Sequence, residues 1–174
     1  MEKSEIGRIA EIDRTEHITT TYLIEDGVLV SREVDWKVPR WPLEGSDDFS
    51  VNGMIKSLVP ILEEDGVLYG AFDGDLLAGI AVFRPRLTKT QAQLVFLHVG
   101  NAYRRQGIGT KLQQETERLA IESGAEELYV SATPSESAVG FYKSHGYIPT
   151  SEPNPALFEL EPDDIHMVKK LQGM

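Results

Sequence analysis

The sequence predicts a single α/β (α+β) domain in which a mixed sheet is covered by helices. Strand-like and helix-like hydrophobic patterns alternate along the chain, which is typical of this fold class. A length of 174 residues corresponds to one compact domain, and 41% apolar residues are enough to build its core. Strand, helix, strand, helix and strand are predicted in that order between Gln93 and Ile148.

The composition disfavours several classes of function. Lys and Arg number 17 and Asp and Glu number 28, so the formal charge is 17 − 28 = −11. This charge disfavours binding to nucleic acids and anionic membranes and would attract a cationic substrate. The chain lacks cysteine, which excludes disulfides, thiolate metal sites and thiol nucleophiles. Without a signal peptide or an apolar run of about 20 residues, a cytoplasmic location is expected.

The histidines give no sign of a metal site. No two of them have the i, i+4 spacing of a helical metal pair, so no metal is expected. The chain contains four: His17, His98, His145 and His166.

The N-terminal segment is predicted to form a strand and a hairpin. Apolar and other residues alternate at period two over residues 5–12, which is typical of a short strand. Residues 22–24 and 28–30 are apolar runs that flank Glu25-Asp26-Gly27. An Asp-Gly pair between such runs is a strong hairpin signal.

A loop and a helix are predicted next. Prolines and both tryptophans lie between Trp36 and Asp48, so this stretch is expected to be a loop with fixed corners. Trp36 and Trp41 either pack in the core or offer an aromatic face to a cationic amine. Apolar residues at helical spacing predict a helix from Val51 to Glu64, which ends at Asp65-Gly66.

Three strands follow in the middle of the chain. The strands 67–72 and 76–83 are joined by Asp73-Gly74-Asp75, a second hairpin signal. Residues 93–99 are predicted to form the third strand.

The remaining elements alternate between helices and strands. A helix that begins near Ile108 is predicted to end at Ser123-Gly124, and residues 128–130 form a strand. A Pro-rich loop is expected to run through Pro162 before a closing strand over residues 165–171.

A second helix is predicted before that loop. Thr133 is its candidate N-cap, with Pro134 at the first helical position and Glu136 three residues after the cap. The helix should run to about Ser144 and end at Gly146 in the left-handed conformation.

The most informative segment runs from Leu97 to Thr110, where a strand leads through a basic, glycine-bearing turn into a helix. Free N–H groups and the dipole at a helix start favour an anion, and glycines let it approach the backbone. Arg104, Arg105 and Lys111 add positive charge, although a tight turn with surface arginines is the alternative. The chain lacks the Gly-Lys-Ser/Thr of a P-loop and the Gly-x-Gly-x-x-Gly of a dinucleotide fold.

Two motifs in this half of the chain carry a resemblance to a known family. Arg104-Arg105-Gln106-Gly107-Ile108-Gly109 resembles the Gln/Arg-x-x-Gly-x-Gly/Ala signature of the GNAT superfamily of N-acetyltransferases. Thirty residues later, residues 135–147 resemble the family's second motif, an Asn-x-x-Ala-x-x-Phe-Tyr helix followed by Gly-Phe. Residues 165–168 resemble its last strand.

The resemblance implies the GNAT-like acyl-CoA N-acyltransferase fold, with a mixed, mostly antiparallel central sheet flanked by helices. It divides the single domain over residues 1–174 into a cofactor-binding core over about 67–171 and acceptor-side elements over about 20–64. A homodimer is also implied, because members of the family often dimerise.

The resemblance also implies acetyl-coenzyme A as co-substrate. Main-chain groups of Leu97 and Val99 would bond to the pantetheine arm, and the turn 104–110 would hold the pyrophosphate. Ser135 stands where the family often has Asn. The cofactor-binding residues implied in this way are Leu97, Val99, Arg104, Arg105, Gln106, Gly107, Ile108, Gly109, Thr110, Ser135, Ser137 and Tyr142.

The implied reaction is direct attack of a primary amine, of a small molecule or a protein, on the thioester carbonyl. Tyr142 matches the family tyrosine near the thioester sulfur and would donate a hydrogen bond to the leaving thiolate; packing under the sheet is the alternative role. Main-chain N–H groups of the Leu97 strand would stabilise the oxyanion.

The base that deprotonates the amine is less defined in the sequence. Some family members have a glutamate on this strand. Gln93 occupies that position in this sequence, and its amide accepts no proton. His98, on the same strand, has a suitable ordinary pKa and is the candidate catalytic base. A non-catalytic strand histidine, proton loss through water, and Glu33 or Asp35 of the early hairpin are the alternatives.

Other polar residues are predicted to be structural or solvated. His145 would complement the C-terminal dipole of its helix. His17 and His166 give no catalytic signal, and the acidic runs 126–127 and 159–164 are expected to be solvated faces.

The acceptor amine is unidentified, and the net charge favours a cationic one. A second hypothesis is a non-catalytic sensor of acyl-coenzyme A, because Gln93 and Ser135 replace residues that the family often uses.

Overall fold

The computed structural model describes residues 1–46 and 49–171, which form an α+β domain around a six-stranded sheet. In chain order the elements are the 3₁₀ helix η1 (Lys3–Glu11), β1 (Glu16–Glu25), β2 (Val28–Val38), α1 (Val51–Glu64), β3 (Val67–Asp73), β4 (Leu76–Arg84), β5 (Gln91–Val99), the 3₁₀ turn η2 (Asn101–Tyr103), α2 (Ile108–Glu122), β6 (Glu127–Ala132), α3 (Glu136–Ser144), β7 (Ile148–Pro149), α4 (Pro155–Leu160) and β8 (Ile165–Lys170).

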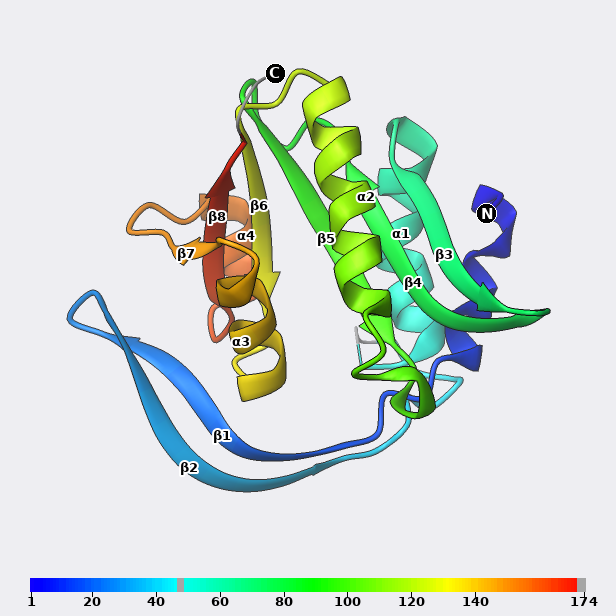
Figure 1. Cartoon of the computed structure of the whole chain (residues 1–174), viewed down its shortest axis with the longest axis horizontal. Coiled ribbons are helices and arrows are strands. Elements are labelled where there is room, and N and C mark those ends of the chain that lie inside the picture. The colour runs from blue at the N-terminus through cyan, green and yellow to red at the C-terminus, as the bar shows by residue number, and fades with distance from the viewer. Residues whose placement is uncertain (47–48, 172–174) are drawn as a thin grey trace.

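The sheet has the order β3-β4-β5-β6-β8-β7. All of its strand pairs are antiparallel except β5 and β6, which are parallel. Helices α2 and α3 cover one face, and α1, α4 and η1 lie on the other (Figure 1). The predicted mixed, mostly antiparallel sheet flanked by helices is therefore confirmed.

Two apolar clusters hold the helices onto the sheet. Successive strand residues point to opposite faces, so Ala81 and Phe83 of β4 face α2 and α3, whereas Ile80 and Val82 face α1. All four side chains are almost fully buried, as is Leu62 of α1. Each large buried side chain stabilises the fold by roughly 1.5–3 kcal/mol.

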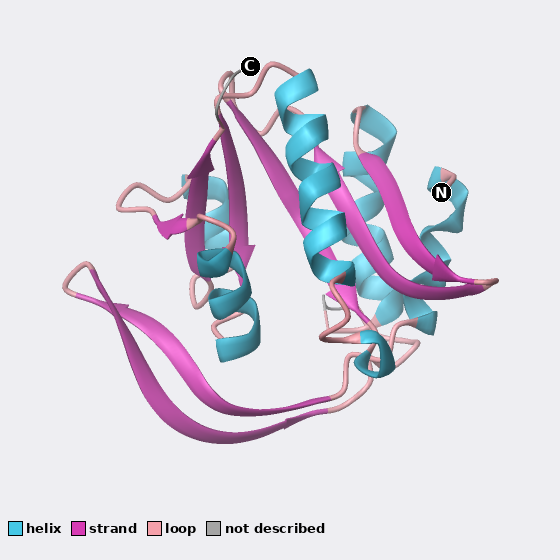
Figure 2. Cartoon of the chain, in the orientation of Figure 1, coloured by secondary structure: helices cyan, strands magenta, loops and turns pink. Residues whose placement is uncertain are grey.

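Strands β1 and β2 form a separate two-stranded hairpin. The pairing extends from Glu16 and Val38 to Glu25 and Val28, with a bulge after Ile18. Figure 2 shows a long curved ribbon that runs beneath the six-stranded sheet in this view. The predicted hairpin and its turn are confirmed, but the strands are longer than the apolar runs that predicted them.

The main helices begin and end largely where the sequence predicts. Ser50 caps α1 by accepting a hydrogen bond from Gly53 N–H. Gly124 after α2 and Gly146 after α3 have φ values of +81° and +86°, the left-handed conformation that favours glycine. Within the described residues, no helix combines the length and apolar character needed to cross a membrane.

The strand predicted over residues 5–12 is wrong, because residues 3–11 form the 3₁₀ helix η1. Its buried residues are Ile6 and Ile9, and Ile12 is buried directly after it. This spacing of three matches the three residues per turn of a 3₁₀ helix. It also places all three side chains on one face, where they pack with α1.

The predicted cap of α3 is also wrong. Ser135, not Thr133, is the N-cap, and its Oγ accepts a hydrogen bond from Ala138 N–H at 3.2 Å. Pro134 therefore precedes the cap. Its carbonyl accepts hydrogen bonds from Tyr22 N–H and Thr21 Oγ1 of β1, which holds this residue outside the helix.

Two predicted loops contain regular structure. Residues 36–38 belong to β2 and not to the loop predicted over 36–48, of which residues 47–48 lie outside the described part of the chain. The Pro-rich loop contains α4, whose start is fixed by Pro155 in the first turn and by the Asn154 side chain, which accepts from Leu157 N–H.

Candidate functional site

Strands β5 and β6 form a fork. They pair only over residues 91–93 and 127–129, and beyond these residues they diverge (Figure 1). The fork is defined here as residues 94–99 of β5 and 130–132 of β6. Main-chain groups along such a split have no partner in the neighbouring strand, so an extended ligand can bond to them.

Two residues of β5 present such main-chain groups. Gly100 N–H donates to Ala78 O at 2.9 Å, and antiparallel ladders bond at alternate residues. The main-chain groups of Leu97 and Val99 therefore point away from β4, toward the fork. These are the two residues that the sequence predicts to bind pantetheine.

The turn before α2 presents a row of free N–H groups. Gly107 is the N-cap with φ +80°, and Arg105 has φ +60°. The first intrahelical bond is donated by Lys111 N–H to Gly107 O, so the preceding N–H groups of α2 have no partner in the helix. Arg105 is exposed and makes no ion pair with any described residue. This geometry fits a phosphate group.

The remaining residues of the turn have more restricted surroundings. The Gln106 amide donates to Ala102 O at 3.1 Å, and Ile108 is half-buried. A Cβ on Gly109 would lie 3.3 Å from the Phe141 ring, so glycine allows α2 and α3 to approach closely.

The Thr110 hydroxyl lies 3.2 Å from His145 Nε2. His145 Nδ1 lies 2.8 Å from Phe141 O, at the end of α3 as predicted.

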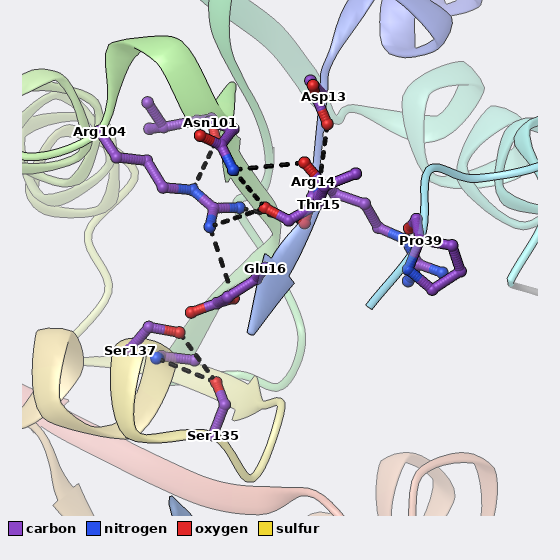
Figure 3. Close-up of polar contacts among 11 residues, drawn as sticks. Asp13, Arg14, Thr15, Glu16, Pro39, Asn101, Arg104, Ser135 and Ser137 are labelled. Carbon is purple, nitrogen blue, oxygen red and sulfur yellow. Dashed lines mark hydrogen bonds and ion pairs between the residues drawn. The ribbon is translucent and has the colours of Figure 1, made fainter. Parts of the chain in front are cut away.

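Arg104 is engaged by the segment that leads into β1 (Figure 3). Its guanidinium donates to Val99 O at 3.2 Å and to Arg14 O at 3.3 Å, and it lies 3.5 Å from the Glu16 carboxylate. Asn101 adds a hydrogen bond to Thr15 O at 2.6 Å. The Arg104 side chain thus ties the turn to β1, a role that the sequence analysis did not predict.

β1 borders the open end of the fork. Its start bonds to the β5 side through Arg104 and Asn101, and its Tyr22 N–H donates to Pro134 O on the β6 side at 2.9 Å. A continuous strand between these two anchors must cross from one arm of the fork to the other. The acceptor-side role predicted for the hairpin is compatible with this position.

Tyr142 lies in the core cluster that also contains Leu94, Leu97 and Val130 of the fork. Its side chain is buried, with ring contacts to Phe141 and Tyr147, and its hydroxyl has no hydrogen bond to a described residue. Burial, followed by the nearby Tyr69 and Asp164, raises the pKa of Tyr142 above its ordinary value. The hydroxyl therefore stays protonated at neutral pH and can donate a hydrogen bond.

Ser135 and Ser137 lie at the start of α3. Ser135 is 2% exposed, and its hydroxyl already accepts the capping bond from Ala138 N–H and lies 3.1 Å from Ser137 Oγ. Ser137 is exposed. Of the two hydroxyls, Ser137 is the one that a bound molecule can reach.

His98 is packed between aromatic rings. The ring centroids of Phe96 and Trp41 lie 4.6 Å and 4.8 Å from its own. Burial, followed by the charges of Arg104 and Arg14, lowers the pKa of His98 to about 3. Its side chain is therefore neutral and weakly basic at pH 7, which argues against the predicted role as base.

The other predicted bases also have unfavourable environments. Gln93 is 4% exposed, and its Oε1 is buried without a hydrogen bond to a described residue. Asp35 pairs with His17 at 2.6 Å on the exposed hairpin, and Glu33 is also exposed. Neither of these hairpin carboxylates is buried near Tyr142.

The two tryptophans have different roles. Trp41 is 8% exposed and packs in the α1 cluster, with the Arg14 guanidinium 5.1 Å from its ring centroid. Trp36 on β2 is 47% exposed. Only Trp36 is open to a cationic ligand.

A buried polar network beside the fork was missed by the sequence analysis. His166 Nε2 donates to Glu161 O at 2.9 Å, which leaves Nδ1 to accept from the Tyr129 hydroxyl at 2.7 Å. Tyr129 in turn accepts from Asn154 N–H at 3.1 Å. Both ends of α4 are therefore anchored to the sheet. These residues are far apart in the sequence, and no local pattern connects them.

Asp164 was predicted to lie on a solvated face, but its side chain is half-buried. Burial, followed by the charges of Glu161 and Asp163, raises the pKa of Asp164 to about 7. The acidic run 159–164 marks the segment in the sequence, but the sequence does not show which of its carboxylates is buried.

The comparisons with solved structures identify this fold. A nourseothricin acetyltransferase is 18% identical, with 99% of this chain and 96% of that chain covered and a TM-score of 0.72. An aminoglycoside 6′-N-acetyltransferase complexed with coenzyme A is 21% identical, with 77% and 86% covered and a TM-score of 0.58. The PaiA N-acetyltransferase from Thermoplasma acidophilum in complex with coenzyme A is 20% identical, with 72% and 74% covered and a TM-score of 0.55.

Sequence comparison gives the family. No curated protein matches the chain. The model of the Acetyltransferase (GNAT) family matches residues 29–147, which is more than half of the chain and includes the fork, the turn before α2 and α3. The chain therefore belongs to the GNAT family of acetyltransferases.

Proposed function

We propose that this acetyl-coenzyme A-dependent N-acetyltransferase acts on a primary amine of a small cationic molecule. The observation that carries the proposal is the fork, where the main-chain groups of Leu97 and Val99 are directed toward the side occupied by Tyr142. Strand β5 supplies polar main-chain groups, and α3 supplies the Tyr142 hydroxyl, which has no hydrogen bond to a described residue.

The turn before α2 is the proposed binding site of the pyrophosphate. Free N–H groups of residues 108–110 and the positive end of the helix dipole would stabilise its charge, with Arg105 adding a cation at the surface. Val99 and Leu97 would then bond to the pantetheine arm. The Arg104 Nε donates to Val99 O, so a pantetheine amide bonded to the second lone pair of that oxygen would lie beside the Arg104 side chain.

Acetyl-coenzyme A supplies the thioester, and the chain supplies hydrogen-bond donors. The N–H of Leu97 would stabilise the negative charge that develops on the carbonyl oxygen. The Tyr142 hydroxyl, which stays protonated, would donate to the leaving sulfur. No covalent bond to the enzyme is required.

The cationic acceptor is supported by charge and by similar structures. The formal charge of −11 attracts cations. Two of the similar structures are acetyltransferases of nourseothricin and of aminoglycosides. An amine of a protein is the second acceptor to test.

A sensor that binds acyl-coenzyme A without turnover is the second candidate function. Gln93 cannot accept a proton, and the pKa of His98 is far below that of an amine, so neither residue predicted near the thioester is an effective base. This candidate predicts cofactor binding without acceptor-dependent thiol release.

Three further expectations accompany the proposal. Catalysis requires no metal, the enzyme acts in the cytoplasm, and the chain forms a homodimer. Each stays a prediction, to be tested by activity after chelation, by fractionation and by sedimentation.

Free-thiol release from acetyl-coenzyme A tests the proposal. Nourseothricin, an aminoglycoside with a 6′-amine, spermidine and a lysine-rich peptide serve as acceptors, with a no-acceptor control. Release that depends on a small cationic amine supports the proposal, and release with the peptide alone assigns a protein acceptor. Thermal protection by acetyl-coenzyme A without any release supports the sensor.

A further inference from the structure

Asp164 lies at the open end of the fork. It directly precedes Ile165, whose partner is Ala132, the last residue of β6. Its own N–H donates to Glu161 O at 3.3 Å, the oxygen that also accepts from His166 Nε2. The main chain of Asp164 is therefore fixed on both sides, by the β6–β8 ladder and by the network that anchors α4.

The Asp164 carboxylate has no partner in the described part of the chain. It makes no hydrogen bond or ion pair with any described residue, although it is half-buried. The ionisable groups that act on it are Glu161 and Asp163 of its own segment, and its charge in turn raises the pKa of Tyr142 of α3. On the neighbouring strands, Tyr129 and His166 are bonded to each other. An unpaired anion in this position attracts a cation.

The position relative to Tyr142 gives this carboxylate a place in the reaction. Tyr142 is the proposed donor to the leaving sulfur, and Asp164 is close enough for its charge to act on that hydroxyl. An amine that binds Asp164 is therefore held at the end of the fork where the thioester is proposed to lie.

We propose that the Asp164 carboxylate is the base that deprotonates the acceptor ammonium. The inference rests on the proposed amine acceptor. One N–H bond of the ammonium breaks and an O–H bond forms on Asp164, which leaves a neutral amine with a free electron pair. This pair forms the N–C bond to the thioester carbonyl, and the C–S bond breaks with its electrons on sulfur.

Proton transfer completes the balance. The second proton of the attacking nitrogen goes to the thiolate, with the Tyr142 hydroxyl donating to sulfur and regaining a proton. Asp164 releases its proton to solvent. A carboxylate with a pKa of about 7 suits this role better than an ordinary exposed one, because the best base at neutral pH has a pKa near that pH.

The first test compares Asp164→Asn with Glu159→Gln, which removes an exposed carboxylate of the same acidic run that does not act on Asp164. With the best small amine acceptor, kcat/KM of Asp164→Asn should fall by about 10²–10⁴-fold, and that of Glu159→Gln by less than about threefold. Coenzyme A should bind both variants with unchanged Kd. The loss in Asp164→Asn should shrink as pH rises toward the pKa of the amine, because more acceptor is then already neutral. A loss that is constant with pH, or a wild-type rate in Asp164→Asn, would overturn the proposal.

The second test needs no acceptor. In the wild-type protein saturated with coenzyme A, the Asp164 side-chain carbon should titrate near pH 7 by NMR, assigned by its loss in Asp164→Asn. A titration midpoint below pH 5 would overturn the proposal that Asp164 is the base. Failure of the wild type to acetylate any amine would instead overturn the proposed acceptor class, so the two failures are distinct.

A cooperative melting transition of Asp164→Asn is the control for its folding. Because the folded pKa is above the unfolded value, ionisation of Asp164 weakens the fold as pH rises from about 4 to 7. The melting temperature of Asp164→Asn should therefore be higher than that of the wild type at pH 8 and equal to it near pH 4. A lower melting temperature at pH 8 would contradict the unpaired, half-buried carboxylate on which the proposal depends.

Discussion

The two faces of the sheet differ where β5 and β6 separate. Toward α2 and α3, the face is apolar and includes Leu97 and Tyr142. Toward α1 and α4, it carries His98 among aromatic rings and the bonded pair Tyr129 and His166. The apolar face fits the proposed thioester arm. Asp164, which directly precedes β8, fits an amine. Binding of the cofactor and recognition of the acceptor are thus assigned to different residues.

Tyr142→Phe gives the largest effect expected on the apolar face. Loss of the hydroxyl removes a hydrogen-bond donor to the leaving sulfur, and kcat should fall on the order of 100-fold. The ring still packs against Tyr147, so Kd for coenzyme A should stay within about twofold, as calorimetry can measure. An unchanged kcat would reduce Tyr142 to a packing residue and remove the chemical distinction between the faces.

His98 offers a test on the opposite face through pH. The folded pKa of about 3 is below the ordinary 6.5, so the unfolded chain binds more protons between these values. Stability is therefore full above pH 6.5 and decreases as pH falls toward 3, by about 2 kcal/mol at pH 4.5 after allowance for partial exposure. Denaturant unfolding of His98→Phe should show a weaker pH dependence. If the stability of the wild type and of His98→Phe changed equally with pH, His98 would be solvated, as a catalytic base would be.

Gly107→Val tests the phosphate turn with a matched control. Gly107 and Gly124 lie at the two ends of α2, with φ of +80° and +81°, and a Cβ on either would meet nothing within 4 Å. Valine at each position forces the same strain, roughly 1–2 kcal/mol. Only Gly107→Val should weaken coenzyme A binding, by about tenfold. Equal Kd values for the two variants would show that the turn does not bind the pyrophosphate.

Ser135→Ala should have the smallest effect. The hydroxyl is buried and caps α3, so its loss should cost about 1 kcal/mol of stability in denaturant unfolding. Kd for coenzyme A should change by less than about twofold, because the hydroxyl faces its own helix. A tenfold weaker Kd at unchanged stability would assign Ser135 to the cofactor, as the family motif implies.

The sequence predicts the elements whose signals are local. Hydrophobic spacing and end signals give α1, and Gly124 and Gly146 mark the ends of α2 and α3. The first helix is missed because Ile6, Ile9 and Ile12 have a spacing of three, which a short window confuses with alternation.

The acceptor side depends on contacts between distant segments. The raised pKa of Asp164 arises from burial beside Glu161, and α4 is held by Tyr129 and His166. Similarly, the lowered pKa of His98 depends on Trp41, 57 residues away in the chain, covering its ring. Residue types identify candidate bases, but only tertiary packing decides which of them can accept a proton.

A crystal structure of the protein with coenzyme A tests the division between the faces most directly. We expect the pantetheine arm to bond to the main chain of Leu97 and Val99, the pyrophosphate to lie at residues 107–110, and the thiol to lie beside Tyr142. Asp164 should remain open to the acceptor. Coenzyme A bound on the His98 side, or with its pyrophosphate away from the turn, would contradict the account.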